Sequence, residues 1–209
     1  MGKQARDTHR AAEHAAAQAA AAKRAHRRKL LPYGLAAGAL VLVLAIVIPL
    51  VVSSSTPAPL SGMHVFAEKN HKHVTTTVHY DRTPPAGGAH SAVWQNCGIY
   101  TQPIKNEHGV HSLEHGAVWI TYRPTLSTSE VNALQSFARA HETGAQGYVL
   151  LSPYPGLPSP VVATAWGAQI ALTGPTDPRL EAFTAKYIGG SQGGEKGAEC
   201  TGGIGTPVA

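Results

Sequence analysis

The most strongly apolar part of the chain runs from Leu30 to Val52 and contains no charged residue. A helix of these 23 residues would span roughly 34 Å at about 1.5 Å per residue, enough to cross the hydrocarbon core of a bilayer. A cleaved signal peptide is the alternative, but its apolar core would be only about 7–15 residues long. The pattern therefore predicts an uncleaved transmembrane signal anchor at residues 30–52.

Beyond this segment, short apolar runs alternate with helical patterns and with turns rich in Gly and Pro. Two helices are predicted by their start signals, a capping box from Ser127 to Glu130 and an N-cap Asp177 followed by Pro178. Because the elements are short and irregularly mixed, we expect one α+β domain with short strands and about two helices. The stretches with strand character are residues 73–80, 117–122, 148–151, 161–166 and 169–172.

Basic residues are concentrated in front of the apolar segment. Residues 1–29 are Ala-rich and contain eight Lys or Arg but only two Asp or Glu. The positive-inside bias places this tail in the cytoplasm, where it is either solvated or a helix lying on anionic lipid. We therefore predict a single-pass protein of the plasma membrane with a cytoplasmic tail (1–29), an anchor (30–52), a Ser/Pro linker (53–60) and an extracytoplasmic domain (61–209).

The charge of the remaining chain argues against nucleic-acid binding. The formal net charge of +5 belongs to the tail, since the rest of the chain holds nine basic and ten acidic residues. A nearly neutral domain lacks the basic surface that binding to a phosphate backbone requires. The partners we expect are the membrane and an envelope protein.

Cys97 and Cys200 are the two cysteines of the chain. Outside the cytoplasm two cysteines usually form a disulfide, and this one would tie the Gly-rich C-terminal segment to the His-rich segment. The alternative is that Cys97 binds a metal ion as a thiolate.

Histidine is unusually frequent and unevenly placed, with eight of the twelve between His64 and His115. If residues 110–116 form a helical turn, His111, Glu114 and His115 share one face. His90 is the preferred fourth ligand, because the Pro-Pro and Gly-Gly pairs before it fix a tight turn. Imidazoles with one carboxylate suit zinc or copper.

The other histidines of the domain are weaker candidates for metal ligands than these three and Glu114. His79, at the end of a predicted strand, and His108, one turn before His111, are the alternatives to His90. His71 and His73 are expected to be solvated. The lone histidines His64 and His141 are expected at the surface, and the three tryptophans, at 94, 119 and 166, in the core.

This cluster is compatible with several classes of function. The string from His111 to His115 matches the His-x-x-Glu-His motif of one peptidase class, but Gly116 and an apolar run follow at once, where that motif needs a long helix. We predict metal binding, with a metal-dependent hydrolase at the same residues as the first alternative. A metal-free envelope interaction module, in which the histidines are structural, is the second.

Four motifs of the chain resemble those of a membrane-anchored bacterial family catalogued as domain of unknown function 3105. They are Pro84-Pro85-x-Gly-Gly-x-His90, Trp94-Gln-Asn-Cys-Gly-x-Tyr100, Val110-His-Ser-Leu-Glu-His-Gly-Ala-Val118 and Tyr122-Arg-Pro124, and the resemblance extends over residues 62–203. It implies a single-pass anchor and an external domain, and it brings no established reaction.

Overall fold

The computed structural model describes Lys23 and residues 57–141 and 147–208 of the chain. The predicted anchor and almost all of the basic tail lie outside the described residues. Among the residues described, no helix is both long and apolar enough to cross a membrane.

Residues 57–141 and 147–208 form one α+β domain, as the sequence predicts, and it is built around a six-stranded sheet. The strand order is β1-β6-β5-β3-β4-β2. The central strand β3 pairs in parallel with β4 and antiparallel with β5, so the sheet is mixed. The strands are β1 (Met63–Val65), β2 (Gly98–Ile99), β3 (Val118–Tyr122), β4 (Val149–Pro153), β5 (Val161–Ala165) and β6 (Ala168–Leu172).

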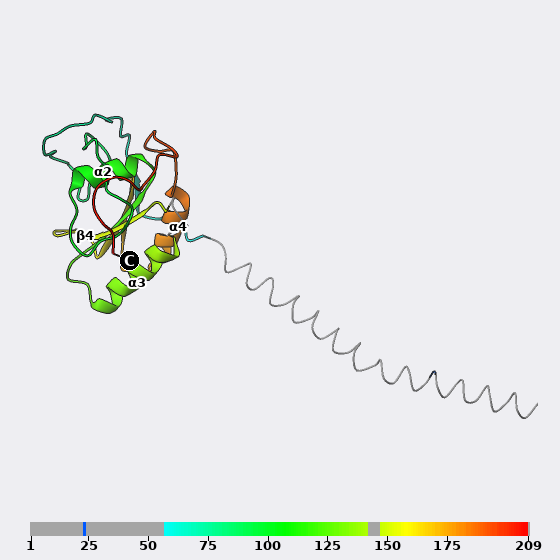
Figure 1. Cartoon of the computed structure of the whole chain (residues 1–209). Coiled ribbons are helices and arrows are strands. Elements are labelled where there is room, and N and C mark those ends of the chain that lie inside the picture. Colours follow the sequence, from blue (N-terminus) through cyan, green and yellow to red (C-terminus); the bar gives the residue numbers. More distant parts are fainter. Residues whose placement is uncertain (1–22, 24–56, 142–146, 209) are drawn as a thin grey trace, which may run out of the picture. The chain divides into compact units, whose positions relative to one another are not determined.

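Helices cover both faces of the sheet. α3 (Thr128–Ala140) and α4 (Pro178–Tyr187) pack on one face, and α2 (Asn106–Glu114) lies on the other together with long loops (Figure 1). Side chains alternate along β3 accordingly, since Val118 and Ile120 belong to the core under α3 and α4, whereas Trp119 belongs to the core under α2. Both faces of β3 are therefore buried, which explains its continuous apolar sequence.

The local start signals of two helices are confirmed. Ser127 and Glu130 form the predicted capping box of α3, with the Glu130 N–H donating to the Ser127 side chain and the Glu130 carboxylate accepting from the Ser127 N–H. Asp177 caps α4 and accepts from the backbone N–H of Arg179. The four predicted strands between residues 117 and 172 are also present.

Two predictions about secondary structure are wrong. Residues 73–80 do not form a strand, because their only ladder contact is an isolated bridge between His73 and His90, and Val78 N–H donates to a Glu107 carboxylate instead. The described residues hold three helices, not about two, since residues 106–114 form a full helix.

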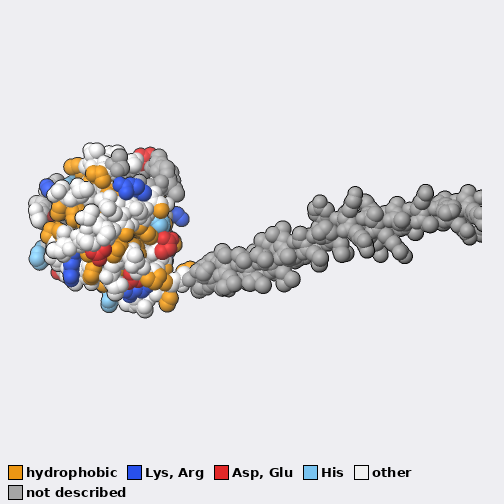
Figure 2. All heavy atoms as spheres, turned by 90° about the horizontal axis from the view of Figure 1, so that it is seen from below, with side chains coloured by type: hydrophobic (Ala, Val, Ile, Leu, Met, Phe, Trp, Pro, Cys, Tyr) orange, Lys and Arg blue, Asp and Glu red, His pale blue; other side chains and the backbone are white. Residues whose placement is uncertain are grey.

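The surface of the domain mixes side chains of both signs. On the face drawn in Figure 2, basic and acidic side chains lie interspersed among apolar ones. The long loops and the C-terminal segment lie around α2, on the face of the sheet opposite α3 and α4 (Figure 1).

Candidate metal centre

The helix that carries the candidate ligands is held close to the sheet by a glycine. A Cβ on Gly109 would lie 2.8 Å from Cζ3 of Trp119. Because no side chain intervenes, α2 packs tightly, and its last turns are buried. His111, Glu114 and the C-cap residue His115 therefore extend from a fixed helix end.

Four side chains meet beside this helix end, and we call them the inner cluster: His73, His90, His111 and Glu114. One ligand atom from each lies within 4.8 Å of those of the other three. His90, His111 and Glu114 are buried, whereas the His73 side chain is 45% exposed. Three imidazoles and one carboxylate form a donor set that Zn(II) or Cu(II) accepts.

Backbone carbonyls fix the orientation of the buried rings. His90 Nδ1 lies 2.7 Å from the Gly88 carbonyl oxygen, and His111 Nδ1 lies 2.7 Å from that of Ser91. A carbonyl oxygen can only accept, so each Nδ1 carries the proton and donates it. The lone pair of each neutral ring is then at Nε2, the arrangement that metal-binding histidines usually show.

One contact in the inner cluster joins two atoms that have no hydrogen-bond partner. His90 Nε2 and Glu114 Oε2 lie 2.7 Å apart, and both are buried without a hydrogen-bond partner. With the Nδ1 proton donated to Gly88, a neutral His90 presents only a lone pair to the carboxylate. Two buried acceptors in contact are costly unless a positive charge, a metal ion or an additional proton, lies beside them.

Burial keeps His111 in the form that binds metal. Desolvation lowers the pKa of His111 to about 4, and the neighbouring imidazoles act in the same direction, against the bond to the Ser91 carbonyl. At neutral pH the ring is therefore uncharged and has no proton to lose before it binds an ion.

A second group shares one residue with the first, and we call it the outer cluster: His111, His115 and Glu195. Its ligand atoms also lie within 4.8 Å of one another. His115 Nε2 is 3.2 Å from a Glu195 carboxylate oxygen, and His111 Nε2 is 3.9 Å from the same oxygen. The Glu195 side chain is 46% exposed, so this cluster reaches the surface.

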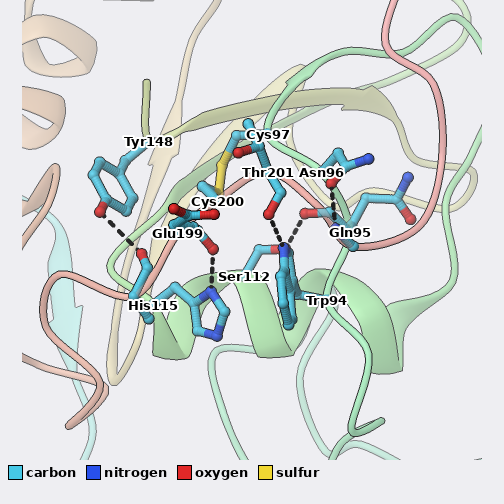
Figure 3. The surroundings of a disulfide bond; sticks show 12 residues. Trp94, Gln95, Asn96, Cys97, Ser112, His115, Tyr148, Glu199, Cys200 and Thr201 are labelled. Carbon is cyan, nitrogen blue, oxygen red and sulfur yellow. Dashed lines mark hydrogen bonds between the residues drawn. A yellow bond between two sulfur atoms is a disulfide. The ribbon is translucent and has the colours of Figure 1, made fainter. Parts of the chain in front are cut away.

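The predicted disulfide is present and holds the C-terminal segment against α2. Cys97 and Cys200 are joined, and Cys97 N–H also donates to the Cys200 carbonyl at 2.7 Å. The neighbouring Glu199 carbonyl accepts from His115 Nδ1 at 2.7 Å, which leaves Nε2 of this ring as its acceptor (Figure 3). Cys97 is therefore not available as a thiolate ligand.

An aromatic ring covers the outer cluster. Trp94 is only half-buried, and its ring centroid lies 4.8 Å from that of His115 and 5.6 Å from that of His111. The prediction that all three tryptophans are core residues therefore holds for Trp119 and Trp166 but is wrong for Trp94.

The structure divides the predicted ligand set in two. Three of its members, His90, His111 and Glu114, lie together in the inner cluster. His115 projects to the other side of His111 and meets Glu195 instead. The helix ends at Glu114, so the His-x-x-Glu-His string spans a helix end, not a helix interior.

The sequence predicts His71 and His73 to be solvated, but both lie at the site. His73 belongs to the inner cluster, and His71 Nδ1 contacts the second carboxylate oxygen of Glu114. The alternatives His79 and His108 belong to neither cluster; His79 is exposed, and the ring of His108 bonds to a backbone carbonyl.

Glu195 is the ligand candidate that sequence reasoning missed. It lies in a Gly-rich segment without secondary-structure pattern, 80 positions after His115. The sequence feature that could have identified it is its separation of five positions from Cys200. The disulfide holds the residues around Cys200 next to the His-rich segment.

A family profile described as "Protein of unknown function (DUF3105)" matches residues 71–202, a range that includes both clusters and the disulfide. The comparisons with curated proteins and with solved structures gave no match.

Proposed function

We propose that this chain, which belongs to the family of proteins of unknown function DUF3105, binds one transition-metal ion at its inner cluster. The ion is zinc or copper in the divalent state, because the donors are imidazole nitrogens and a carboxylate. His90, His111 and Glu114 are the buried ligands, and His73 completes the set from the exposed side.

One observation carries this proposal, the buried contact between His90 Nε2 and Glu114 Oε2. Neither atom has a hydrogen-bond partner, although more than nine in ten buried polar groups of folded proteins do. A bound cation satisfies both atoms at once. The Nδ1 bonds of His90 and His111 support the same conclusion, since they direct both lone pairs into the cluster.

Water and small ligands can reach the bound ion from the side of His73. A pocket of about 350 Å³ lies there, next to the one inner ligand that is not buried. Its lining comes from the loop between residues 72 and 76 and from Ala92. Water or a small ligand can approach the ion from this pocket.

The same geometry favours binding over hydrolysis. A metal-dependent hydrolase needs a free carboxylate to act as base on a metal-bound water. Glu114 is not free for this role, because Oε1 contacts His71 and Oε2 is itself a ligand of the ion in this proposal. The metal-free interaction module is the remaining alternative, and in it an additional proton, not a metal ion, satisfies the contact between His90 and Glu114.

We also propose that the domain lies outside the cytoplasm of a single-pass plasma-membrane protein. Support comes from the uncharged apolar residues 30–52 and from the disulfide, which is typical of oxidising compartments. Protease added to intact cells should then degrade the domain and leave residues 1–29 intact, whereas protection of both parts would refute this topology.

Metal content is the direct test of the binding proposal. The full chain, purified in detergent without a His tag and stripped by a chelator, is titrated with Zn(II) or Cu(II) and analysed by elemental analysis. We expect one tightly bound ion per chain, lost in His90→Gln/His111→Gln and kept in His79→Ala, a control that removes an exposed histidine outside both clusters.

Two results would refute the proposal. One is the absence of bound zinc and copper in the parent protein, which would leave the metal-free module. The other is an unchanged stoichiometry in the double variant with its native near-ultraviolet circular dichroism, which would move the ion elsewhere.

A further inference from the structure

The two clusters compete for a single lone pair. His111 belongs to both, but its Nδ1 donates to the Ser91 carbonyl, so only Nε2 can bind an ion. An imidazole nitrogen has one lone pair and binds one ion at a time. The inner and outer clusters therefore cannot both hold an ion through His111.

We propose that the outer cluster is the position through which the ion is loaded into and released from the inner cluster. This inference rests on the proposed function and extends it, because it makes the divalent ion an exchangeable cargo instead of a permanent cofactor. The ion first binds Glu195 and His115 at the surface, takes up Nε2 of His111, and then exchanges its outer ligands for the inner ones.

The exposure of the ligands gives this route its direction. The outer carboxylate, Glu195, is 46% exposed, whereas the inner one, Glu114, is 3% exposed. A hydrated cation meets the exposed charge first and loses water as it moves inward, where fixed donors replace its hydration shell. His111 keeps one bond to the ion throughout, so the ion is never left without a protein ligand.

The outer cluster is a built site, not a chance meeting of surface groups. The His115 side chain is 4% exposed, and its Nδ1 is held by the Glu199 carbonyl, so its Nε2 is buried and directed at Glu195. A Cβ on Gly193 would lie 2.3 Å from the backbone of Glu114. The segment before Glu195 therefore lies directly on the helix end, where only glycine fits.

Charge removal at Glu195 gives a kinetic test with a matched control. Glu195→Gln removes the outer carboxylate, and Asp81→Asn removes another exposed carboxylate, which is in neither cluster. Association of Cu(II) with the stripped full chain is followed by quenching of tryptophan fluorescence in stopped flow, and release is followed with a competing chelator.

We expect Glu195→Gln to slow association and release together, each by about tenfold, since electrostatic steering raises association rates by 10–10³ and an ion that leaves crosses the same position. The equilibrium Kd changes by less than either rate, and the stoichiometry stays at one ion per chain, because a position on the route lowers the barrier in both directions. Asp81→Asn keeps the parent rates.

Three results would overturn the inference while leaving the proposed function intact. Two bound ions per chain would show that the clusters fill independently. Faster release with unchanged association would make Glu195 an ordinary ligand of the final site. Equal rates in Glu195→Gln and Asp81→Asn would show that the ion takes another route. Failure of the parent to bind any ion would instead refute the proposed function itself.

Discussion

The substitution Gly109→Ala in α2 has two opposing effects on stability, a gain in helix propensity and a steric cost in the core. In a helix interior this change usually stabilises a protein by about 0.5–1 kcal/mol, because glycine loses more backbone entropy on folding. Here the new Cβ would lie 2.8 Å from Cζ3 and 3.0 Å from Cη2 of Trp119. The Trp119 ring is fully buried, and its Nε1 donates to Ser152 Oγ at 3.0 Å, so it cannot move away freely.

The cost of overpacking decides the sign of this prediction. Forcing an additional methyl group into a packed core costs about 1–3 kcal/mol, so we expect a net loss of about 1–2 kcal/mol in the free energy of unfolding. Urea denaturation measures it, with Gly174→Ala as control, since a Cβ there meets no atom within 4 Å. Because α2 must shift to admit the methyl group, we also expect weaker binding of the metal ion by His111 and Glu114.

A more stable Gly109→Ala variant would refute the reasoning, because it would show that α2 does not approach Trp119 as closely as the structure indicates. Loss of stability in Gly174→Ala as large as in Gly109→Ala would also contradict it, since the cost would then not arise from the contact with the ring.

Two further predictions concern stability alone. Cys200→Ser opens a loop of 103 residues. The chain-entropy model gives an upper limit of about 4–5 kcal/mol for the free energy of unfolding that is lost, and we expect urea denaturation to show a loss of at least about 2 kcal/mol. A loss below about 1 kcal/mol would contradict this. Hydrogen bonds to the Asp177 carboxylate, the largest from the Arg179 side chain and smaller ones from Thr173, lower the pKa of Asp177 well below its usual value. A lowered carboxyl pKa stabilises the folded state above the unfolded pKa near 4, and this contribution is lost as the pH falls further. Asp177→Asn should therefore cost about 1–2 kcal/mol at pH 7 and progressively less toward pH 2, and an equal cost at both pH values would contradict the assignment.

Local signals predicted most of the domain because the elements concerned need no information from distant residues. The Ser127–Glu130 capping box lies within one turn of α3, and the apolar run of β3 is enough to specify a strand buried on both faces. The strand prediction for residues 73–80 was wrong because an alternating pattern of side chains does not supply a partner strand. Apart from the bridge at His73, these residues contact loops and α2.

The candidate site was predictable only where a local pattern marks its residues. His111 and Glu114 could be paired by helical spacing, and His90 by the rigid turn before it. His73 looked solvated because its pairing with His90 is a tertiary contact. Glu195 carries no local pattern, and its place depends on the path of a segment that the disulfide and a row of glycines determine.

The order of the ligand candidates along the chain has a consequence for folding. The residues of the inner cluster all precede residue 115, whereas Glu195 and the Glu199 carbonyl that orients His115 come 80 or more positions later. In a reduced chain no covalent bond holds the segment of Glu195 beside α2, so we expect the outer cluster to depend on the disulfide more than the inner cluster does. We therefore expect oxidation of the two cysteines to complete the outer cluster.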